Sequence, residues 1–325
     1  MQAEKEWIYP AIGLTLAMAA AALVFTPNSA GLLSNLVILP SWMLASAVVG
    51  SIYALVRMMA MGVKSPLAEL GRIVREDRNW LIGMMLMIGL AGANMMAFLW
   101  FKPLLNYLVP FRADPFLAQA DRWLAFGHDP FSLLDWLDVP GAEFVYHKLW
   151  TGMMILTLLV VAARPASADK SAVMLGYFVL WSVVGPLVHI LMPAAGPIFY
   201  ARMGYGDHFA ALGPGPETRV MADYLWAVYD SRSFGAGSGI SAMPSLHVTT
   251  AVWMALAIRV HAPRFFWPMA MFSALLFALS IALGWHYALD GVIGGACAVA
   301  VHFGLRAWFR ARRMDVNARP AQVTA

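Results

Sequence analysis

The chain has 325 residues, of which 61% are hydrophobic and 12% are charged, and its formal net charge is +4. Soluble domains are roughly 45–50% apolar and about 25% charged, so the composition excludes an ordinary soluble enzyme and also a disordered chain. The 13 Trp and 22 Met residues suit lipid and its interfaces. We therefore predict an all-α, polytopic integral membrane protein.

Eight stretches are apolar and about as long as a membrane-spanning helix, which needs about 20 residues. In chain order they cover roughly 8–26, 31–57, 80–103, 141–163, 172–192, 244–262, 265–284 and 286–308. An even number of spans puts both termini on the same side. The first stretch has no small-residue cleavage site before the second begins, so we predict a retained helix rather than a signal peptide.

The spans and the polar segments between them divide the chain into four parts. Residues 1–60 form two N-terminal transmembrane helices, and 61–79 form an amphipathic linker on the cytoplasmic surface. Residues 80–308 form a six-helix catalytic core. Residues 309–325 are polar, and we expect a disordered cytoplasmic tail.

Basic residues predict the orientation of the spans, because cytoplasmic loops are rich in Lys and Arg. The termini and the segments 57–79, 164–171 and 259–264 hold 15 of the 22 Lys and Arg residues. These parts are therefore predicted to be cytoplasmic, and the long loops at 104–140 and 193–243 to face the periplasm, or a lumen in a eukaryote. The compact loops favour a bacterial inner membrane. Because the basic residues follow the topology, we expect the bilayer and no nucleic acid as a partner.

An ionisable pair lies in the last predicted span. Asp290 follows His286 by four residues in an otherwise apolar stretch, and an ionisable residue inside a span is costly and suggests a functional site. On a helix, positions i and i+4 share a face, so the two side chains are predicted to meet near the non-cytoplasmic end. The carboxylate would then fix the imidazole tautomer and leave one nitrogen free as a nucleophile or base. A purely structural His–Asp link is the alternative.

The segment Ser241-Ala242-Met243-Pro244-Ser245-Leu246-His247 directly precedes another apolar stretch. Pro and Ser at this position are typical of a helix N-terminus, where free N–H groups hold anions such as phosphate. His247 falls in the first turn, and the glycines between Gly235 and Gly239 allow a close approach to a ligand.

Together, two histidines, a carboxylate and a helix start on one membrane side suit phosphoryl transfer through a covalent histidine. No carboxylate cluster resembles a magnesium site, so we predict a metal-free mechanism without cofactors.

Pro244-Ser245-Leu246-His247 and the stretch from Gly284 to Gly291 resemble the second and third motifs, P-S-G-H and S-R-x5-H-x3-D, of the type 2 phosphatidic acid phosphatase superfamily. The resemblance covers roughly residues 80–308. It implies that His286 is the nucleophile that becomes phosphohistidine, that Asp290 orients it, and that His247 is the general acid. Ser245 would contribute to the phosphate pocket, and the substrate would be a lipid phosphate.

The chain departs from the family pattern at its cations. The first motif, K-x6-R-P, is absent, Ser280 stands where the third motif has Arg, and Leu246 replaces a Gly. These changes are similar to those of the inositol phosphorylceramide and sphingomyelin synthases. Since phosphate still needs positive charge, we expect Lys148, Arg202 or Arg232 to supply it, although each also suits a snorkelling interfacial residue.

The sequence thus predicts a membrane enzyme that transfers a phosphoryl or phospho-headgroup, such as phosphoinositol, from a lipid to a ceramide-like or polyol alcohol, or to water. A phosphatase acting on phosphatidic acid or an isoprenoid pyrophosphate is one alternative. A proton-coupled transporter, in which His286 and Asp290 relay protons, is another.

Overall fold

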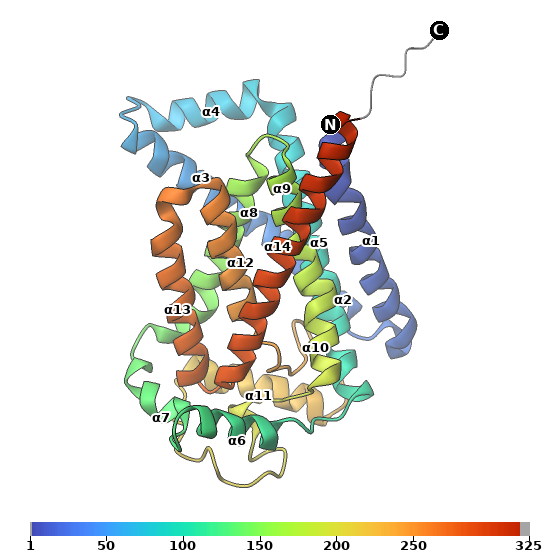
Figure 1. Ribbon diagram of the computed structural model, residues 1–325, viewed down its shortest axis with the longest axis vertical. Coiled ribbons are helices and arrows are strands. Elements are labelled where there is room, and N and C mark those ends of the chain that lie inside the picture. Colours follow the sequence, from blue (N-terminus) through green and yellow to red (C-terminus); the bar gives the residue numbers. More distant parts are fainter. Residues whose placement is uncertain (1, 319–325) are drawn as a thin grey trace.

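The computed structural model describes residues 2–318, with side chains described for residues 4–312. All regular elements within this range are helices (Figure 1). The long ones are α1 (Gln2–Phe25), α3 (Ile38–Ala60), α5 (Arg78–Leu108), α8 (Trp150–Ala162), α9 (Ala168–Val179), α12 (Leu246–His261), α13 (Phe266–Ala282) and α14 (Ala288–Ala318). Two segments are π-helical. The segment η3 (Phe144–Leu149) directly precedes α8, and η4 (Leu180–Val184) joins α9 to α10 (Gly185–Leu191).

The shorter helices lie at the two ends of the bundle. They are α2 (Leu32–Leu36), α4 (Pro66–Glu76), α6 (Asp114–Leu124), α7 (Pro130–Leu134) and α11 (Pro216–Asp230), with the 3-10 turns η1 (Pro27–Ser29), η2 (Asp135–Leu137), η5 (Pro197–Phe199) and η6 (Pro263–Phe265).

Seven helical segments of the described chain are long and apolar enough to cross a membrane. This confirms the predicted all-α membrane protein. The remaining predicted span, 244–262, corresponds to α12, which has 16 residues and therefore a length of about 24 Å. Helix α12 is shorter than the predicted span because it begins only after its N-cap, Ser245, and ends at His261.

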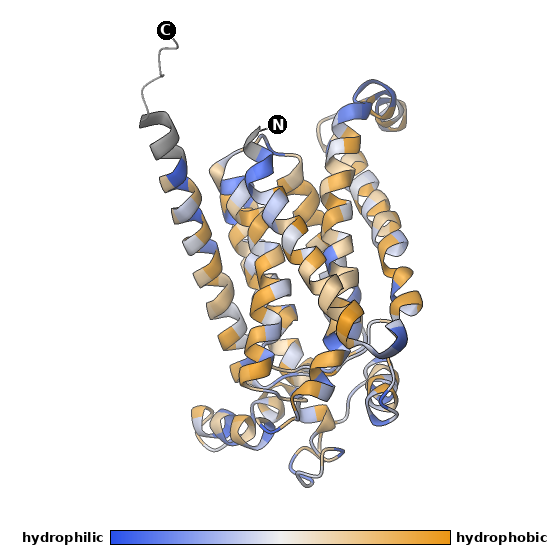
Figure 2. Ribbon diagram, turned by 90° about the vertical axis from the view of Figure 1, so that its right-hand side faces the viewer, coloured by the Kyte–Doolittle hydropathy of each residue, from blue (hydrophilic) through white to orange (hydrophobic). Residues whose placement is uncertain are grey.

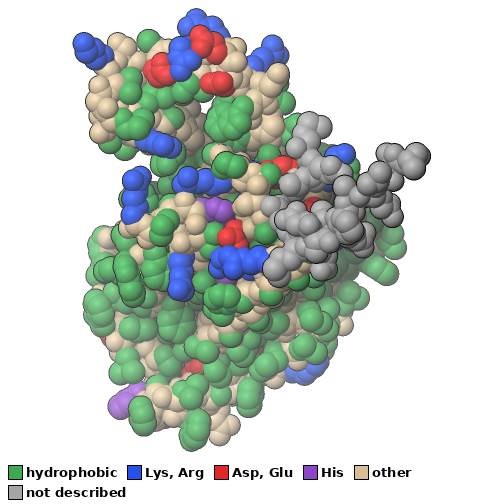
Figure 3. Space-filling view, turned by 45° about the horizontal axis from the view of Figure 1, so that its top comes forward, with side chains coloured by type: hydrophobic (Ala, Val, Ile, Leu, Met, Phe, Trp, Pro, Cys, Tyr) green, Lys and Arg blue, Asp and Glu red, His purple; other side chains and the backbone are tan. Residues whose placement is uncertain are grey.

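The two ends of the bundle differ in the segments they carry. Helix α4 lies at the same end as the start of α1 and the end of α14, whereas α6, α7 and α11 lie at the opposite end (Figure 1). Apolar residues predominate along the bundle between these ends (Figure 2). Lys and Arg side chains are spread over the α4 end (Figure 3). The predicted cytoplasmic segments therefore share one end, although their orientation in a bilayer remains a prediction.

Helix α12 lies at the centre of the core and packs against α8, α13 and α14. Most of its side chains are buried, including Trp253, whose Nε1 donates a hydrogen bond to the carbonyl of Val173 on α9 at 2.9 Å. The buried apolar side chains of α12 belong to the main hydrophobic core cluster, so the helix is held mainly by apolar packing. This rigid position fixes the first turn of α12, which carries His247.

The two N-terminal spans pack closely against the predicted core. On α1, Glu4 forms an ion pair of 2.7 Å with the buried Lys170 of α9. On α3, Trp42 Nε1 donates a hydrogen bond to the carbonyl of Ile88 at 3.1 Å. A β-carbon added at Gly92 of α5 would come within 2.5 Å of the Trp42 ring, so this close approach requires glycine. Helices α1 and α3 are thus structural parts of the bundle.

Helix α14 continues to Ala318, ten residues beyond the end predicted for the last span. The tail that was expected to be disordered from residue 309 is therefore helical over its first part. The rest of that tail, 319–325, lies outside the described residues.

Candidate active site

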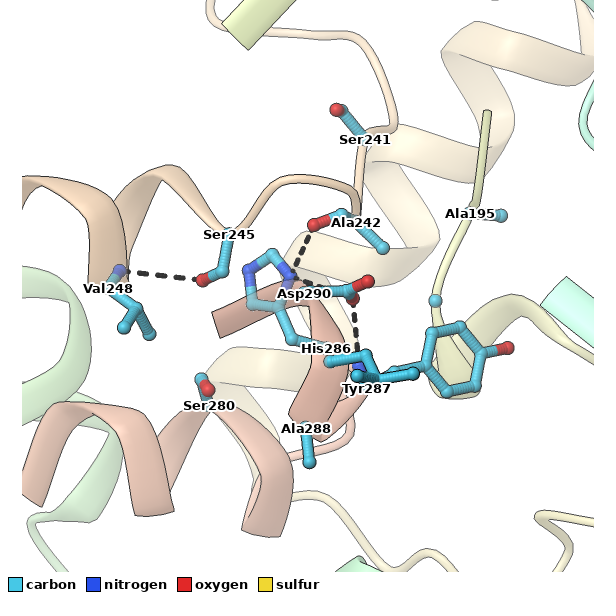
Figure 4. A network of polar contacts seen from close by, with 12 residues as sticks. Ala195, Ser241, Ala242, Ser245, Val248, Ser280, His286, Tyr287, Ala288 and Asp290 are labelled. Carbon is cyan, nitrogen blue, oxygen red and sulfur yellow. Dashed lines mark hydrogen bonds and ion pairs between the residues drawn. The ribbon is translucent and has the colours of Figure 1, made fainter. Parts of the chain in front are cut away.

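His286 lies in the short connection between α13 and α14, at the end of the bundle opposite α4. Its Nδ1 is 2.8 Å from the carbonyl oxygen of Ala242 and 3.5 Å from Oδ2 of Asp290 (Figure 4). A carbonyl oxygen can only accept a hydrogen bond, so Nδ1 carries the proton. In the neutral imidazole, the other ring nitrogen, Nε2, then keeps its lone pair, as a nucleophile requires.

Asp290 is fully buried and holds the connection together from within α14. Its Oδ2 accepts the backbone N–H of Tyr287 at 2.8 Å, and its backbone carbonyl accepts the N–H of Ser245 at 3.1 Å. The structure brings Asp290 to His286, but the closer acceptor for the imidazole N–H is Ala242. The reason is that α14 begins at Ala288, so His286 precedes the helix and the expected i, i+4 helical geometry does not apply.

The other predicted histidine, His247, lies in the first turn of α12. Its ring centroid is 6.4 Å from that of His286. The imidazole is held between two aromatic rings, with centroid distances of 4.5 Å to Tyr146 and 4.1 Å to Trp150. A group bound between His247 and His286 could thus meet both imidazoles.

Ser245 occupies the N-cap of α12, and its hydroxyl accepts the N–H of Val248 at 3.4 Å. The predicted helix start is present at this point. The Ser245 side chain is fully buried and is absent from the cavity wall formed by Pro244, Leu246 and His247. Ser245 therefore caps the helix that carries His247, and its side chain is not part of the cavity wall predicted to hold phosphate.

Both histidines line a cavity of about 690 Å³, within the range of about 300–1,000 Å³ that is typical of small-molecule sites. Helices α3, α5, α8 and α11 and the glycine-rich loop before α12 form most of the remaining wall. Gly239 of this loop has φ +96°, and a β-carbon there would lie 3.0 Å from Cγ of Lys102. The glycine expected to approach a ligand thus approaches a lysine of the cavity wall.

The structure brings one of the three predicted cations to this cavity. Lys148 lines it, is exposed and pairs with Glu217 at 3.3 Å. Arg202 forms an ion pair with Asp223 and lies over the ring of Trp226, outside the cavity wall.

Arg232 follows the end of α11 with φ +51° and also lies outside this wall. Arg202 and Arg232 follow η5 and α11, at the same end of the bundle as the connection that carries His286, but neither contributes to the cavity wall.

Three further residues of the cavity wall were missed. Lys102, near the end of α5, has no hydrogen bond or ion pair with any other described residue. His147 Nε2 and Trp285 Nε1 are buried and lack a hydrogen-bond partner within residues 2–318. Buried polar atoms without partners are rare in proteins. Lys102 could have been found from sequence, because it lies inside the span predicted at 80–103.

Two carboxylates of α6 bind the backbone around His286. Asp121 accepts the N–H groups of Ala288 at 2.5 Å and Leu289 at 3.1 Å, the first residues of α14. Burial raises the pKa of Asp121 to about 6. This helix-capping role was not predicted, since Asp121 and Ala288 are 167 positions apart in the sequence.

Asp114 binds the backbone of the loop that follows α10 in a similar way. It accepts the N–H of Gly196 at 2.8 Å, that of Ala195 at 2.9 Å and the hydroxyl of Tyr287 at 3.0 Å. Burial also raises the pKa of Asp114. Gly196 has φ +107°, and a β-carbon there would lie 2.5 Å from the carbonyl of Trp285. The loop at 193–196 therefore packs directly against the connection that holds His286.

Comparison with known proteins gives one match. A sequence model of the PAP2 superfamily matches residues 115–305, which is more than half of the chain and includes His247, His286 and Asp290. No curated protein and no solved structure matches the chain. Within the described residues, no group of three His, Cys, Asp or Glu side chains is arranged to hold a metal ion.

Proposed function

The chain belongs to the PAP2 superfamily, and on this premise we propose that it transfers a phosphoryl or phospho-headgroup from a membrane lipid through His286. Membership in a family of phosphatases and phosphotransferases favours an enzyme over a proton-coupled transporter. One observation carries the residue assignment: Nδ1 of His286 donates to Ala242, so that in the neutral ring Nε2 is the nitrogen with the lone pair, in a cavity shared with His247.

In the first step, Nε2 of His286 attacks phosphorus, and the bond between phosphorus and the lipid oxygen breaks. His247 donates its proton to that leaving oxygen, which departs as an alcohol. In the second step, neutral His247 takes the proton of water or of an acceptor alcohol, whose oxygen attacks the phosphohistidine. The phosphorus–nitrogen bond breaks, His286 is restored, and His247 is again protonated.

Three groups of the cavity wall support binding of the phosphate. Among the described residues, Lys102 has no carboxylate partner for its positive charge, and the ring N–H of Trp285, a neutral donor, has no acceptor. Lys148 adds charge at the exposed edge of the cavity. Charged donors form the stronger hydrogen bonds to phosphate, so Lys102 is proposed as the main replacement for the cations of the missing first motif.

The acceptor distinguishes two candidate activities. The absent family cations favour headgroup transfer, for example of phosphoinositol to a ceramide-like or polyol alcohol, because a phosphodiester carries a single negative charge. Lys102 and Lys148 together favour the second candidate, a phosphatase that acts on phosphatidic acid or an isoprenoid pyrophosphate. Neither candidate requires a metal ion in the steps above. We propose that the reaction occurs at the periplasmic or lumenal face of the membrane.

Product analysis with purified protein in detergent tests this proposal. We expect phosphatidic acid to yield inorganic phosphate, or phosphatidylinositol with ceramide to yield diacylglycerol and a phosphosphingolipid. The His286→Ala variant should lose turnover by more than about a thousandfold, because it removes the nucleophile. His208→Ala is the matched control, since His208 pairs with Asp129 outside the cavity. Turnover by His286→Ala at the wild-type rate would contradict the assignment.

A further inference from the structure

We infer that the inner part of the cavity binds the hydrocarbon chain of the substrate, and that α3 forms one wall of this chain site. The inference rests on the proposed function, because it assigns the phosphate end of the same molecule to the histidines. Helix α3 lies outside the segment that matches the PAP2 superfamily. The chain site would therefore be a property of this protein's N-terminal helices.

The cavity wall changes in character along the bundle. The part of the wall away from the α4 end carries the polar residues His247, His286, Lys102 and Lys148. Toward the α4 end, the wall is almost entirely apolar, and its residues come from α3, α5, α8 and η4: Ile38, Trp42, Ala45, Met95, Phe98, Leu99, Met154, Ile155 and Trp181. A ligand that fits this wall has an anionic head and an apolar tail.

The length of the apolar part of the cavity can be estimated from the wall residues on three helices. On each helix, the wall residue nearest the α4 end is Ala45 on α3, Met95 on α5 and Ile155 on α8. Met95 is seven residues from Lys102, and Ile155 is seven residues from Lys148. At 1.5 Å per residue, the apolar part extends about 10 Å beyond the cations. It therefore accommodates part of an extended chain rather than only a headgroup.

The cavity reaches the surface beside the start of α3. Val37, the N-cap of α3, and Ser41 of α3 line the cavity and are exposed, as is Lys148 of η3. Both segments belong to predicted membrane spans, so this side of the bundle is expected to face lipid. A chain could thus enter from the bilayer while its charged head stays near Lys148 at the outer edge.

The α3 wall is fixed in position rather than loosely attached. Trp42 lies against Gly92 and bonds to the carbonyl of Ile88. Just before α3, the side chain of Asn35 accepts the N–H of Gly237 at 3.0 Å, which ties the N-terminal helices to the loop preceding His247. Because the wall is rigid, the volume beside Ala45 limits the chain length that the site accepts.

A substitution that fills the inner end tests the inference. Ala45→Trp should reduce kcat/KM for palmitoyl glycerol phosphate by at least about tenfold relative to the hexanoyl compound, because displacing each methylene costs about fourfold in affinity. Ala47→Trp is the matched control, since Ala47 lies on the same helix but is exposed and outside the cavity wall. Farnesyl phosphate in a parallel assay distinguishes an isoprenoid chain from an acyl chain.

The outcomes separate this inference from the proposed function. Ala45→Trp supports the chain site if it lowers kcat/KM only for the long acyl substrate or only for the isoprenoid substrate. The substrate that is affected then identifies the occupant of the site. An equal effect on short and long substrates, or an equal effect of Ala47→Trp, would overturn the chain site while leaving the reaction intact. Absence of turnover in the wild type with every phosphate substrate would instead overturn the proposed function and, with it, this inference.

Discussion

At the scale of single residues, two lysines that look alike in the sequence have very different environments in the cavity wall. Lys102 and Lys148 both line the cavity, but Lys148 is exposed and paired with Glu217, whereas Lys102 is half-buried and unpaired among residues 2–318. Exposed ion pairs contribute little, because water screens them. The unpaired lysine therefore has more to gain from a bound phosphate.

We expect Lys102→Met to lower kcat/KM for the phosphate substrate by about tenfold to a hundredfold, since a hydrogen bond to a charged group contributes about 1.5–3 kcal/mol. Inhibition by inorganic phosphate should weaken by a similar factor. Arg232→Met is the control, and its activity should stay within about twofold of wild type because Arg232 lies outside the cavity. Equal losses in the two variants would show that Lys102 has no special role.

At the scale of elements, α6 holds the start of α14 and, through it, the connection that carries His286. The Asp121 carboxylate accepts two N–H groups at the N-terminus of α14, where negative charge is favourable. Its pKa is raised to about 6 by burial. As the pH falls through about 6, the carboxylate gains a proton and loses the charge that favours these contacts.

Asp121→Asn should therefore lower kcat by about fivefold at pH 7.5, the equivalent of a lost cap worth about 1 kcal/mol. The difference from wild type should narrow as the pH falls below about 6. A difference in global stability would have the opposite pH dependence. Because the pKa of Asp121 is raised in the folded protein, this carboxyl stabilises the wild type at low pH, and the stabilisation is lost as the pH rises through about 6. Asp135→Asn, at an exposed carboxylate of η2, should match wild type throughout. A difference in kcat between Asp121→Asn and wild type that does not change with pH would argue against the capping role of Asp121.

At the scale of the whole molecule, the two ends of the bundle differ in charge and in content. The α4 end carries the segments predicted to be cytoplasmic, and the opposite end carries the cavity histidines with α6, α7 and α11 (Figures 1 and 3). Lys and Arg at one end of a bundle favour retention of that end in the cytoplasm. The site is thus predicted to face outward.

Cysteine labelling in intact cells checks this orientation. In a Cys297→Ala background, which removes the single cysteine, Ser132→Cys on α7 should react with a membrane-impermeant maleimide. Ser65→Cys, just before α4, should react only after the membrane is permeabilised. Both serines are exposed, so accessibility within the protein is matched. The reverse pattern would place the active site on the cytoplasmic side.

The helical membrane class and most span positions could be read from the sequence, because apolar length and composition are local properties. The motif around His247 and His286 was likewise visible, since its residues lie close together in each segment. The hydrogen-bond partner of the His286 N–H could not be predicted. Helix α14 begins two residues later than the predicted span, so the ring precedes the helix and donates to Ala242.

Contacts between distant segments were decided by the tertiary structure alone. Asp121 lies 167 residues from the N–H group it binds, and α3 meets α5 and α8 only after the bundle has formed. The same packing brings Lys102 into the cavity and leaves Arg202 and Arg232 outside it. The sequence by itself determined which residue types were available for phosphate chemistry. Only the fold decided which of them share one cavity, because that depends on how the helices pack and where each one begins.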